Sequence, residues 1–203
     1  MRGATTPANR RLRLAIPLAA TLVAGLAGSA FAQDAKPAPK EPAQPPAKAE
    51  ASGAPQTYES GITNGKGETI GKIMIRDGAN SLVMRVMIGP GGLPPGWHGI
   101  HFHAVGDCSD TEKFANSKAH VNNDQSKHGL LNADGPDEGD LPNIFAATDG
   151  SANTEVSSET SLGGEGCLKD PDGSALVFHA KEDDHTSQPI GGAGDRVACA
   201  VIK

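Results

Sequence analysis

Three features are missing from this sequence of 203 residues, and each absence excludes a class of protein. Glycine, at 26 residues, is about twice as frequent as average, yet no G-x-y period accompanies it, which excludes a collagen-like chain. Basic side chains are not in excess, because 18 Lys and Arg face 24 Asp and Glu, so nucleic acid is not an expected partner. No apolar run reaches the ~20 residues that span a bilayer. The abundant glycine disfavours a helical bundle and favours a turn-rich β protein.

The first 32 residues are typical of a secretory leader. A cationic segment with three arginines precedes the apolar stretch Leu14–Ala27, and the small-x-small sequence Ala30-Phe31-Ala32 stands before Gln33. An uncleaved anchor is disfavoured, because 14 apolar residues are too short and a proline interrupts them. We therefore expect cleavage and export. The exported chain keeps 14 basic and 24 acidic side chains, a formal net charge of −10.

Residues 33–56 form a segment of different composition, with 7 Ala and 6 Pro among 24 residues and almost no bulky side chain. Such a segment cannot bury enough apolar surface to offset the entropy lost on ordering, so we predict a disordered linker. Residues 57–203 are predicted to form one folded domain, since short runs of Val, Ile and Met alternate there with Gly, Asp and Asn.

Several strands can be predicted within this domain. Residues 82–88 alternate as strands do, and Arg76-Asp77-Gly78 before them favours a hairpin turn. A second hairpin is predicted at Asp149-Gly150, with residues 143–148 and 153–156 as its arms. Residues 175–179 and 196–202 read as late strands. Two long irregular stretches remain, 106–142 and 180–195, and loops of this length in a compact domain indicate a functional site.

Histidines cluster in and around these loops. His101 and His103, one residue apart on a predicted strand, share one face of it, while Ile100 and Phe102 take the other face. His120 and His128 lie in the first loop, Asp140 follows them, and His179 ends a strand. Two unrelated exposed histidines would explain an H-x-H pair alone. The whole set of five histidines and a carboxylate indicates a metal site.

Four separated blocks of the sequence carry a resemblance to a known family: GIHFHAVGDCS, H-x7-H-G followed by GDLPN, SALVFHAKEDD, and GGAGDRVACAVI. In this order they resemble the periplasmic copper/zinc superoxide dismutases, over about Thr57 to Lys203. The resemblance implies an all-β fold, an eight-stranded antiparallel Greek-key β-barrel or sandwich with two long metal-site loops. It also implies a periplasmic location and leaves a homodimer open.

The resemblance assigns copper ligands and a reaction. His101, His103 and His179 match three copper ligands, and His120 matches the histidine that bridges copper to zinc. A set of imidazoles suits copper. The implied reaction is the dismutation of superoxide to dioxygen and hydrogen peroxide, with His120 returning one of the two protons.

The zinc side departs from the family pattern. His120, His128 and Asp140 match zinc ligands, but Asp137 stands where the family has a histidine. Zinc accepts carboxylate oxygen, so a site of two histidines and two aspartates is feasible. Alternatively Asp137 is a solvated acid and Asp124 or water completes the site, or zinc is weakly bound or absent.

Further roles follow from the same resemblance. Asp183 matches the carboxylate that links a copper-binding to a zinc-binding imidazole, with Asp184 as its rival. Cys108 and Cys199 match the family's disulfide, and Cys167 is left without an expected partner. Arg196 matches the arginine that docks the superoxide anion.

Lys181 could assist Arg196 or simply be solvated. His98 and His185 match no metal position and are interpreted as structural or solvated. The alternative to an enzyme is a non-catalytic copper-binding or copper-delivery protein on the same fold, although such a carrier needs neither Arg196 nor a proton-returning His120.

Overall fold

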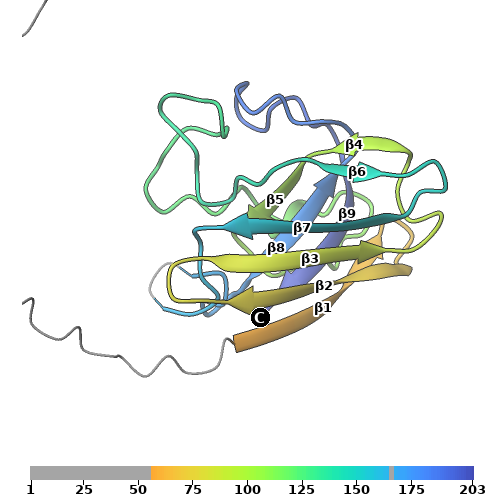
Figure 1. Ribbon diagram of the computed structural model, residues 1–203, viewed down its shortest axis with the longest axis horizontal. Helices are drawn as coiled ribbons and strands as arrows, with labels where there is room; N and C mark the ends of the chain where they lie inside the picture. Colours follow the sequence, from red (N-terminus) through yellow and green to blue (C-terminus); the bar gives the residue numbers. More distant parts are fainter. Residues whose placement is uncertain (1–55, 165–166) are drawn as a thin grey trace, which may run out of the picture. The chain divides into compact units, whose positions relative to one another are not determined.

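The computed structural model describes residues 56–164 and 167–203. The predicted leader and all of the predicted linker except Gln56 lie outside the described residues. The described part of the chain forms nine strands and one short 3-10 helix (Figure 1). The strands are β1 Gln56–Asn64, β2 Thr69–Asp77, β3 Leu82–Ile88, β4 Gly96–His98, β5 Ile100–His103, β6 Ile144–Ala146, β7 Ala152–Ser158, β8 Ser174–His179 and β9 Arg196–Ile202, and the helix η1 is Ala115–Ser117.

Every strand pairing is antiparallel. Seven strands form one curled sheet in the order β5-β8-β9-β1-β2-β3-β7, and β4 pairs with β6 in a second sheet of two strands. Only one residue separates β4 from β5, and a tight turn separates β6 from β7, so the β4–β6 pair connects the two edges of the large sheet. Pairings between strands distant in sequence, such as β5 with β8 and β3 with β7, are typical of Greek-key connections. The predicted all-β fold class is therefore confirmed, with nine strands where eight were expected.

Alternation of side chains places the core inside the barrel. In β3 the residues Leu82, Met84, Val86 and Ile88 are buried, and the residues between them face outward. In β5, Ile100 and Phe102 join the same apolar core, so both histidines of this strand lie on its other face.

Strand β8 is buried on both faces, as its nearly continuous apolar sequence requires. Leu176 and Phe178 point into the barrel core, whereas Ala175 and Val177 pack with Phe114 in a second cluster under the first long loop. This second cluster attaches the loop to the barrel wall.

The predicted hairpin at Asp149-Gly150 was wrong in its pairing. A tight turn is present, in which the N–H of Gly150 donates to Ala147 O (2.8 Å) and Gly150 has a φ of 82°. However, β6 before the turn pairs with β4, and β7 after it pairs with β3. The chain crosses from one sheet to the other at this turn because a better-matched partner, the full length of β3, is available to β7.

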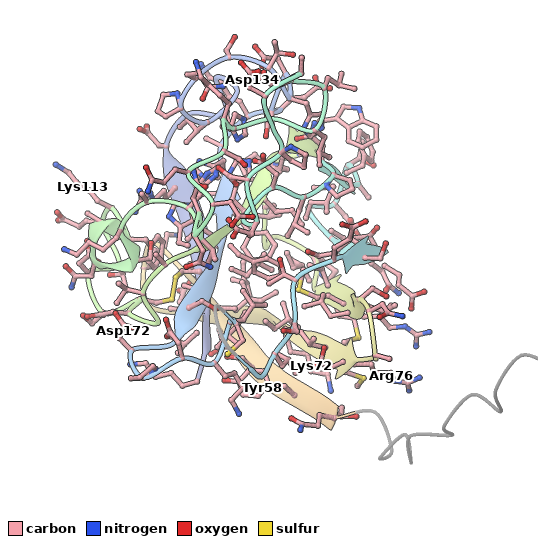
Figure 2. All side chains as sticks on the ribbon, turned by 90° about the vertical axis from the view of Figure 1, so that its left-hand side faces the viewer. Tyr58, Lys72, Arg76, Lys113, Asp134 and Asp172 are labelled. Carbon is pink, nitrogen blue, oxygen red and sulfur yellow. A yellow bond between two sulfur atoms is a disulfide. The ribbon has the colours of Figure 1, made fainter. Side chains whose placement is uncertain are left out.

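The two long loops lie where they were predicted, between β5 and β6 and between β8 and β9. The later part of the first loop and the second loop lie side by side at one end of the barrel. Figure 2 shows Asp134 of the first loop at this end, opposite Tyr58 and Arg76, whereas Lys113 of the same loop lies along the side of the barrel. The N–H of Leu131 donates to His185 O (3.0 Å) between them.

The predicted disulfide between Cys108 and Cys199 is confirmed, with 5.9 Å between the two Cα atoms. It joins the first loop to β9 across 91 residues of sequence. Cys167 is a buried free cysteine. None of the helices in the described ranges has the length and apolarity that crossing a membrane requires.

Candidate metal centre

The site begins on two neighbouring strands. β5 and β8 pair so that His101 lies opposite Val177, and His179 follows at the end of β8. His101, His103 and His179 are almost completely buried, and one ring nitrogen from each lies within 4.8 Å of the other two. The strands thus bring together three of the four histidines predicted to bind copper.

The first loop delivers the fourth histidine. An isolated β-bridge pairs His120 with His103, and the N–H of Val121 donates to Phe102 O (2.9 Å). The ring centroid of His120 is 4.3 Å from that of His101 and 5.1 Å from that of His103. Gly139 permits this approach, because a Cβ atom there would come within 2.5 Å of Phe102 O and 3.0 Å of the His120 Cβ.

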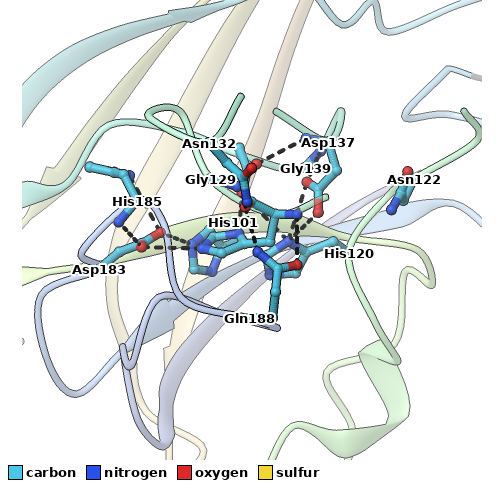
Figure 3. A network of polar contacts seen from close by, with 12 residues as sticks. His101, His120, Asn122, Gly129, Asn132, Asp137, Gly139, Asp183, His185 and Gln188 are labelled. Atoms are coloured by element: carbon cyan, nitrogen blue, oxygen red, sulfur yellow. Dashed lines mark hydrogen bonds and ion pairs between the residues drawn. The ribbon is translucent and has the colours of Figure 1, made fainter. Parts of the chain in front are cut away.

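One nitrogen of each ring is held by the protein. Nδ1 of His103 contacts Lys118 O (2.7 Å), and Nδ1 of His179 contacts Gly194 O (3.0 Å). Nε2 of His101 contacts a carboxylate oxygen of Asp183 (2.7 Å; Figure 3). Carbonyl and carboxylate oxygens only accept hydrogen bonds, so these nitrogens carry the hydrogen and the opposite nitrogens present a lone pair.

The opposite nitrogens are buried and have no hydrogen-bond partner. They are Nδ1 of His101, Nε2 of His103, Nε2 of His120 and Nε2 of His179. A buried polar atom without a partner is costly, and four of them on adjacent rings fit a metal that takes nitrogen ligands. The residues present therefore suit the copper ion that the predicted ligand set requires.

Carboxylates and a second loop histidine lie on the other side of His120. Nδ1 of His120 is 3.0 Å from Oδ2 of Asp137 and 3.7 Å from Oδ1 of Asp140. Nδ1 of His128 is 2.5 Å from Oδ1 of Asp140, although the two atoms are not aligned as a hydrogen bond. One ligand atom from each of these four residues lies within 4.8 Å of the other three, and all four residues are buried. Two imidazoles and two carboxylates suit zinc.

Hydrogen bonds within the loop fix these carboxylates. Oδ2 of Asp140 accepts from the N–H groups of Gly129 (2.7 Å) and Asp137 (3.0 Å), and Oδ1 of Asp137 accepts from Gly139 (3.0 Å). Gly129 has a φ of 118°, which favours glycine and lets its N–H face Asp140. The remaining oxygen of Asp140 is buried and has no hydrogen-bond partner, so it could serve as a metal ligand.

Asp183 links the two halves of the site. Its Oδ2 accepts from His101, while its Oδ1 lies 3.2 Å from Nε2 of His128. Asp183 also lies close enough to His101, His128 and Asp140 to belong to a metal-binding group with them. Because both of its oxygens already contact imidazole nitrogens, we interpret Asp183 as a bridge between the two rings and not as a metal ligand. Asp184 is exposed and accepts only from Thr186 and Ser187 among the contacts described.

The pKa values differ between the histidines predicted to bind copper and the residues that contact carboxylates. Burial lowers the pKa values of His101 and His103, and lowers that of His179 to about 3, which keeps these rings neutral. Burial also acts to lower the pKa of His128, but its contacts with Asp140 and Asp183 outweigh burial and raise that pKa to about 10. Burial favours the protonated form of Asp183, yet hydrogen bonds from His101 and His128 lower its pKa and keep it ionised.

Arg196 stands at the edge of the histidine cluster. Its Nη1 donates to Phe114 O (2.7 Å) and Ser117 Oγ (3.1 Å), and its Nη2 donates to Lys118 O (2.7 Å). The same carbonyl of Lys118 accepts from His103, so the guanidinium is held next to a predicted copper ligand. Its positive charge contributes to the lowered pKa values of His103 and His179.

The other candidates lie apart from these sets. Asp124 is exposed and does not belong to the group of two histidines and two aspartates predicted to bind zinc. Lys181 is exposed as well. His98 is buried, with both ring nitrogens on backbone oxygens, those of His179 and Pro94 (2.7 Å each), and His185 contacts Asn143 and Asp183. These contacts agree with the structural interpretation of the two histidines.

Sequence reasoning missed two residues that position the site. Asn143 Oδ1 accepts from the N–H of Asp183 (2.9 Å), and Asn143 Nδ2 donates to Asp183 O (2.8 Å). Gln188 likewise accepts from the N–H of His128 (3.1 Å) and donates to its carbonyl (2.8 Å; Figure 3). No periodicity marks either residue, because each acts on a segment distant in the sequence.

The fold and the site define a class of protein: a Greek-key β-barrel with a two-part histidine and carboxylate metal centre. Comparison with known proteins narrows this class. The family model described as copper/zinc superoxide dismutase matches residues 69–202. The chain belongs to the copper/zinc superoxide dismutase family.

Individual relatives agree with this assignment. A superoxide dismutase [Cu-Zn] from Caulobacter vibrioides is 46% identical over 147 residues, covering 70% of this chain and 83% of the relative. Superoxide dismutase [Cu-Zn] 1 from Aquifex aeolicus is 39% identical over 146 residues, covering 70% and 85%. The fold is similar to that of the Cu/Zn superoxide dismutase from Brucella abortus, with a TM-score of 0.57, 24% identity, and coverage of 73% of this chain and all of the other.

Proposed function

We propose that this chain dismutates superoxide to dioxygen and hydrogen peroxide at a copper ion held by His101, His103, His120 and His179. The four partnerless ring nitrogens on adjacent buried histidines carry this proposal. When bound, copper supplies the one-electron couple that oxidises one superoxide and reduces the next.

The protein's own residues supply charge and protons. The superoxide anion docks beside Arg196, whose guanidinium is fixed by three hydrogen bonds and opposes the net negative charge of the chain. Formation of hydrogen peroxide consumes two protons, and we assign the donation of one of them to Nε2 of His120, which would hold the proton only while it does not bind copper. A copper carrier needs neither feature, so the carrier alternative is not favoured.

The zinc part of the proposal assigns His120, His128, Asp137 and Asp140 as ligands. What supports Asp137 over Asp124 is burial and distance: Asp137 is 6% exposed and 3.0 Å from His120. Metal analysis of the purified protein tests this assignment. We expect one zinc per chain, lost on Asp137→Ala and kept on Asp124→Ala; retention of zinc by Asp137→Ala contradicts a ligand role for Asp137.

Superoxide removal by copper-loaded protein tests the enzyme proposal. We expect fast removal by the wild type and strong impairment by His120→Ala with copper still bound. The control Asp184→Asn changes an exposed carboxylate outside both ligand sets and should keep activity. If the copper-loaded wild type is no faster than free copper, the enzyme proposal fails and the carrier alternative is preferred.

Export completes the proposal. The leader-like residues 1–32, the linker composition of residues 33–56 and a disulfide in the domain all support secretion, with the periplasm as the destination. N-terminal sequencing of the exported protein should give Gln33 as its first residue.

A homodimer also remains a prediction. Light scattering on the purified protein measures its molar mass and so tests whether it is a dimer.

A further inference from the structure

A large cavity opens on the carboxylate side of the metal centre. Its volume is about 880 Å³, and the buried residues Asp137 and Asp140 form part of its wall. Asp124, Glu138 and Glu159 line it nearer to solvent, and Asp124 and Glu159 are exposed. We call this cavity the acidic vestibule.

The charge of the vestibule has one sign. Five of its lining residues are acidic, and none of the lining residues within the described ranges is Lys, Arg or His. A concave wall lined with one sign of charge concentrates ions of the opposite sign. The vestibule therefore attracts cations and repels superoxide, whereas Arg196, which is not among its lining residues, does the reverse at the histidine cluster.

Asp140, one of the residues that line the vestibule, has an oxygen without a hydrogen-bond partner. Asp140 is 6% exposed, and its Oδ1 has no hydrogen-bond partner. This oxygen lies 3.7 Å from Nδ1 of His120 and 2.5 Å from Nδ1 of His128. The wall thus includes two of the four proposed zinc ligands, Asp137 and Asp140, and the two histidines lie directly behind Asp140. The cavity is also large enough for a hydrated ion, because six waters occupy on the order of 200 Å³.

We propose that the acidic vestibule is the entrance through which a hydrated divalent cation reaches His120, His128, Asp137 and Asp140, separately from the route of superoxide. Asp124, Glu138 and Glu159 attract the ion and guide it, and the buried carboxylates then replace its waters. This inference rests on the proposed zinc ligand set but concerns the rate of metal uptake, which that ligand set does not determine.

Stopped-flow uptake of Co²⁺ by copper-loaded, zinc-free protein tests the proposal, with the growth of the Co²⁺ absorption as the readout. The vestibule variant is Asp124→Asn/Glu138→Gln/Glu159→Gln. Gln at 138 keeps an oxygen that can accept from the N–H of Asn123, as Glu138 does (2.9 Å). The matched control, Glu59→Gln/Glu112→Gln/Asp172→Asn, removes three exposed carboxylates that do not line the vestibule.

At low ionic strength we expect the vestibule variant to bind Co²⁺ about 10-fold more slowly than the wild type. The control should keep the wild-type rate, and the difference should shrink as salt is added. All three proteins should bind the same amount of Co²⁺ at equilibrium. Equal rates for the two triple variants overturn the entrance, whereas absence of Co²⁺ binding by the wild type overturns the ligand set itself.

Discussion

The disulfide offers the most quantitative prediction, because it closes a long loop. Replacing both Cys108 and Cys199 by alanine releases a constraint that spans 91 residues. For that length the chain-entropy model gives about 4 to 5 kcal/mol at 25 °C, and removal of native disulfides typically costs about 2 to 5 kcal/mol. We therefore expect the free energy of unfolding to fall by about 3 to 5 kcal/mol.

The loss should extend from stability to activity. Cys199 of β9 is fully buried and packs against Phe114 of the first long loop. The same loop supplies the carbonyl groups of Phe114 and Lys118, which accept hydrogen bonds from Arg196. Among the described residues, the other contacts that join this loop to β9 are apolar packing around Phe114 and the hydrogen bonds of Arg196. Docking of the superoxide anion should weaken as the guanidinium loses its fixed position.

Urea unfolding of the metal-free protein measures the first effect. With a slope of about 2 kcal/mol per molar urea, the midpoint should move down by about 2 M. The control is Cys167→Ala, which removes the buried free thiol and should cost about 1 kcal/mol. A double variant that is no less stable than this control would refute the reasoning, and unchanged kcat/KM would refute the link to Arg196.

Three further predictions concern the site. Asp183→Asn should weaken zinc binding about 10- to 100-fold in chelator competition, because an amide cannot accept from both imidazoles, whereas Asp184→Asn should not. Arg196→Gln should lower kcat/KM about 10-fold and weaken its dependence on ionic strength, and an unchanged salt dependence would argue against anion docking. Because the pKa of His179 falls from 6.5 in the unfolded chain to about 3 on folding, the unfolded chain gains its proton first as the pH drops. The metal-free protein should therefore lose a few kcal/mol of stability between pH 6.5 and 4.5, and a flat urea-unfolding profile would contradict this. His128, with a pKa raised to about 10, acts in the opposite sense and only above pH 6.5.

Local patterns in the sequence were sufficient to predict features that lie within a single strand. Residues 82–88 and 196–202 are strands over the predicted ranges, because alternation or a continuous apolar run reports burial directly. The shared face of His101 and His103 follows from the same period of two. The disulfide pairing, in contrast, came from the family resemblance, since spacing alone does not pair three cysteines.

Predictions that depend on pairing fared less well. The prediction of a turn at Asp149-Gly150 was correct, but the two arms do not pair with each other: β6 pairs with β4 and β7 pairs with β3. The choice of partner depends on the whole length of the matching strands, which a local pattern does not show. The position of Asp137 illustrates the same limit: the sequence leaves its role open, and only the folded loop places it 3.0 Å from His120.

By itself the sequence determined several of the strands, the two loops and the residue types of the site, because these depend on spacing along one chain. Only the tertiary structure decided which nitrogen of each imidazole is held and which is left without a partner, and which carboxylates face His120. Those outcomes depend on contacts such as Lys118 with His103 and Asp183 with His101, whose partners lie 15 and 82 residues apart. Contacts of this kind form only when the barrel brings distant segments together.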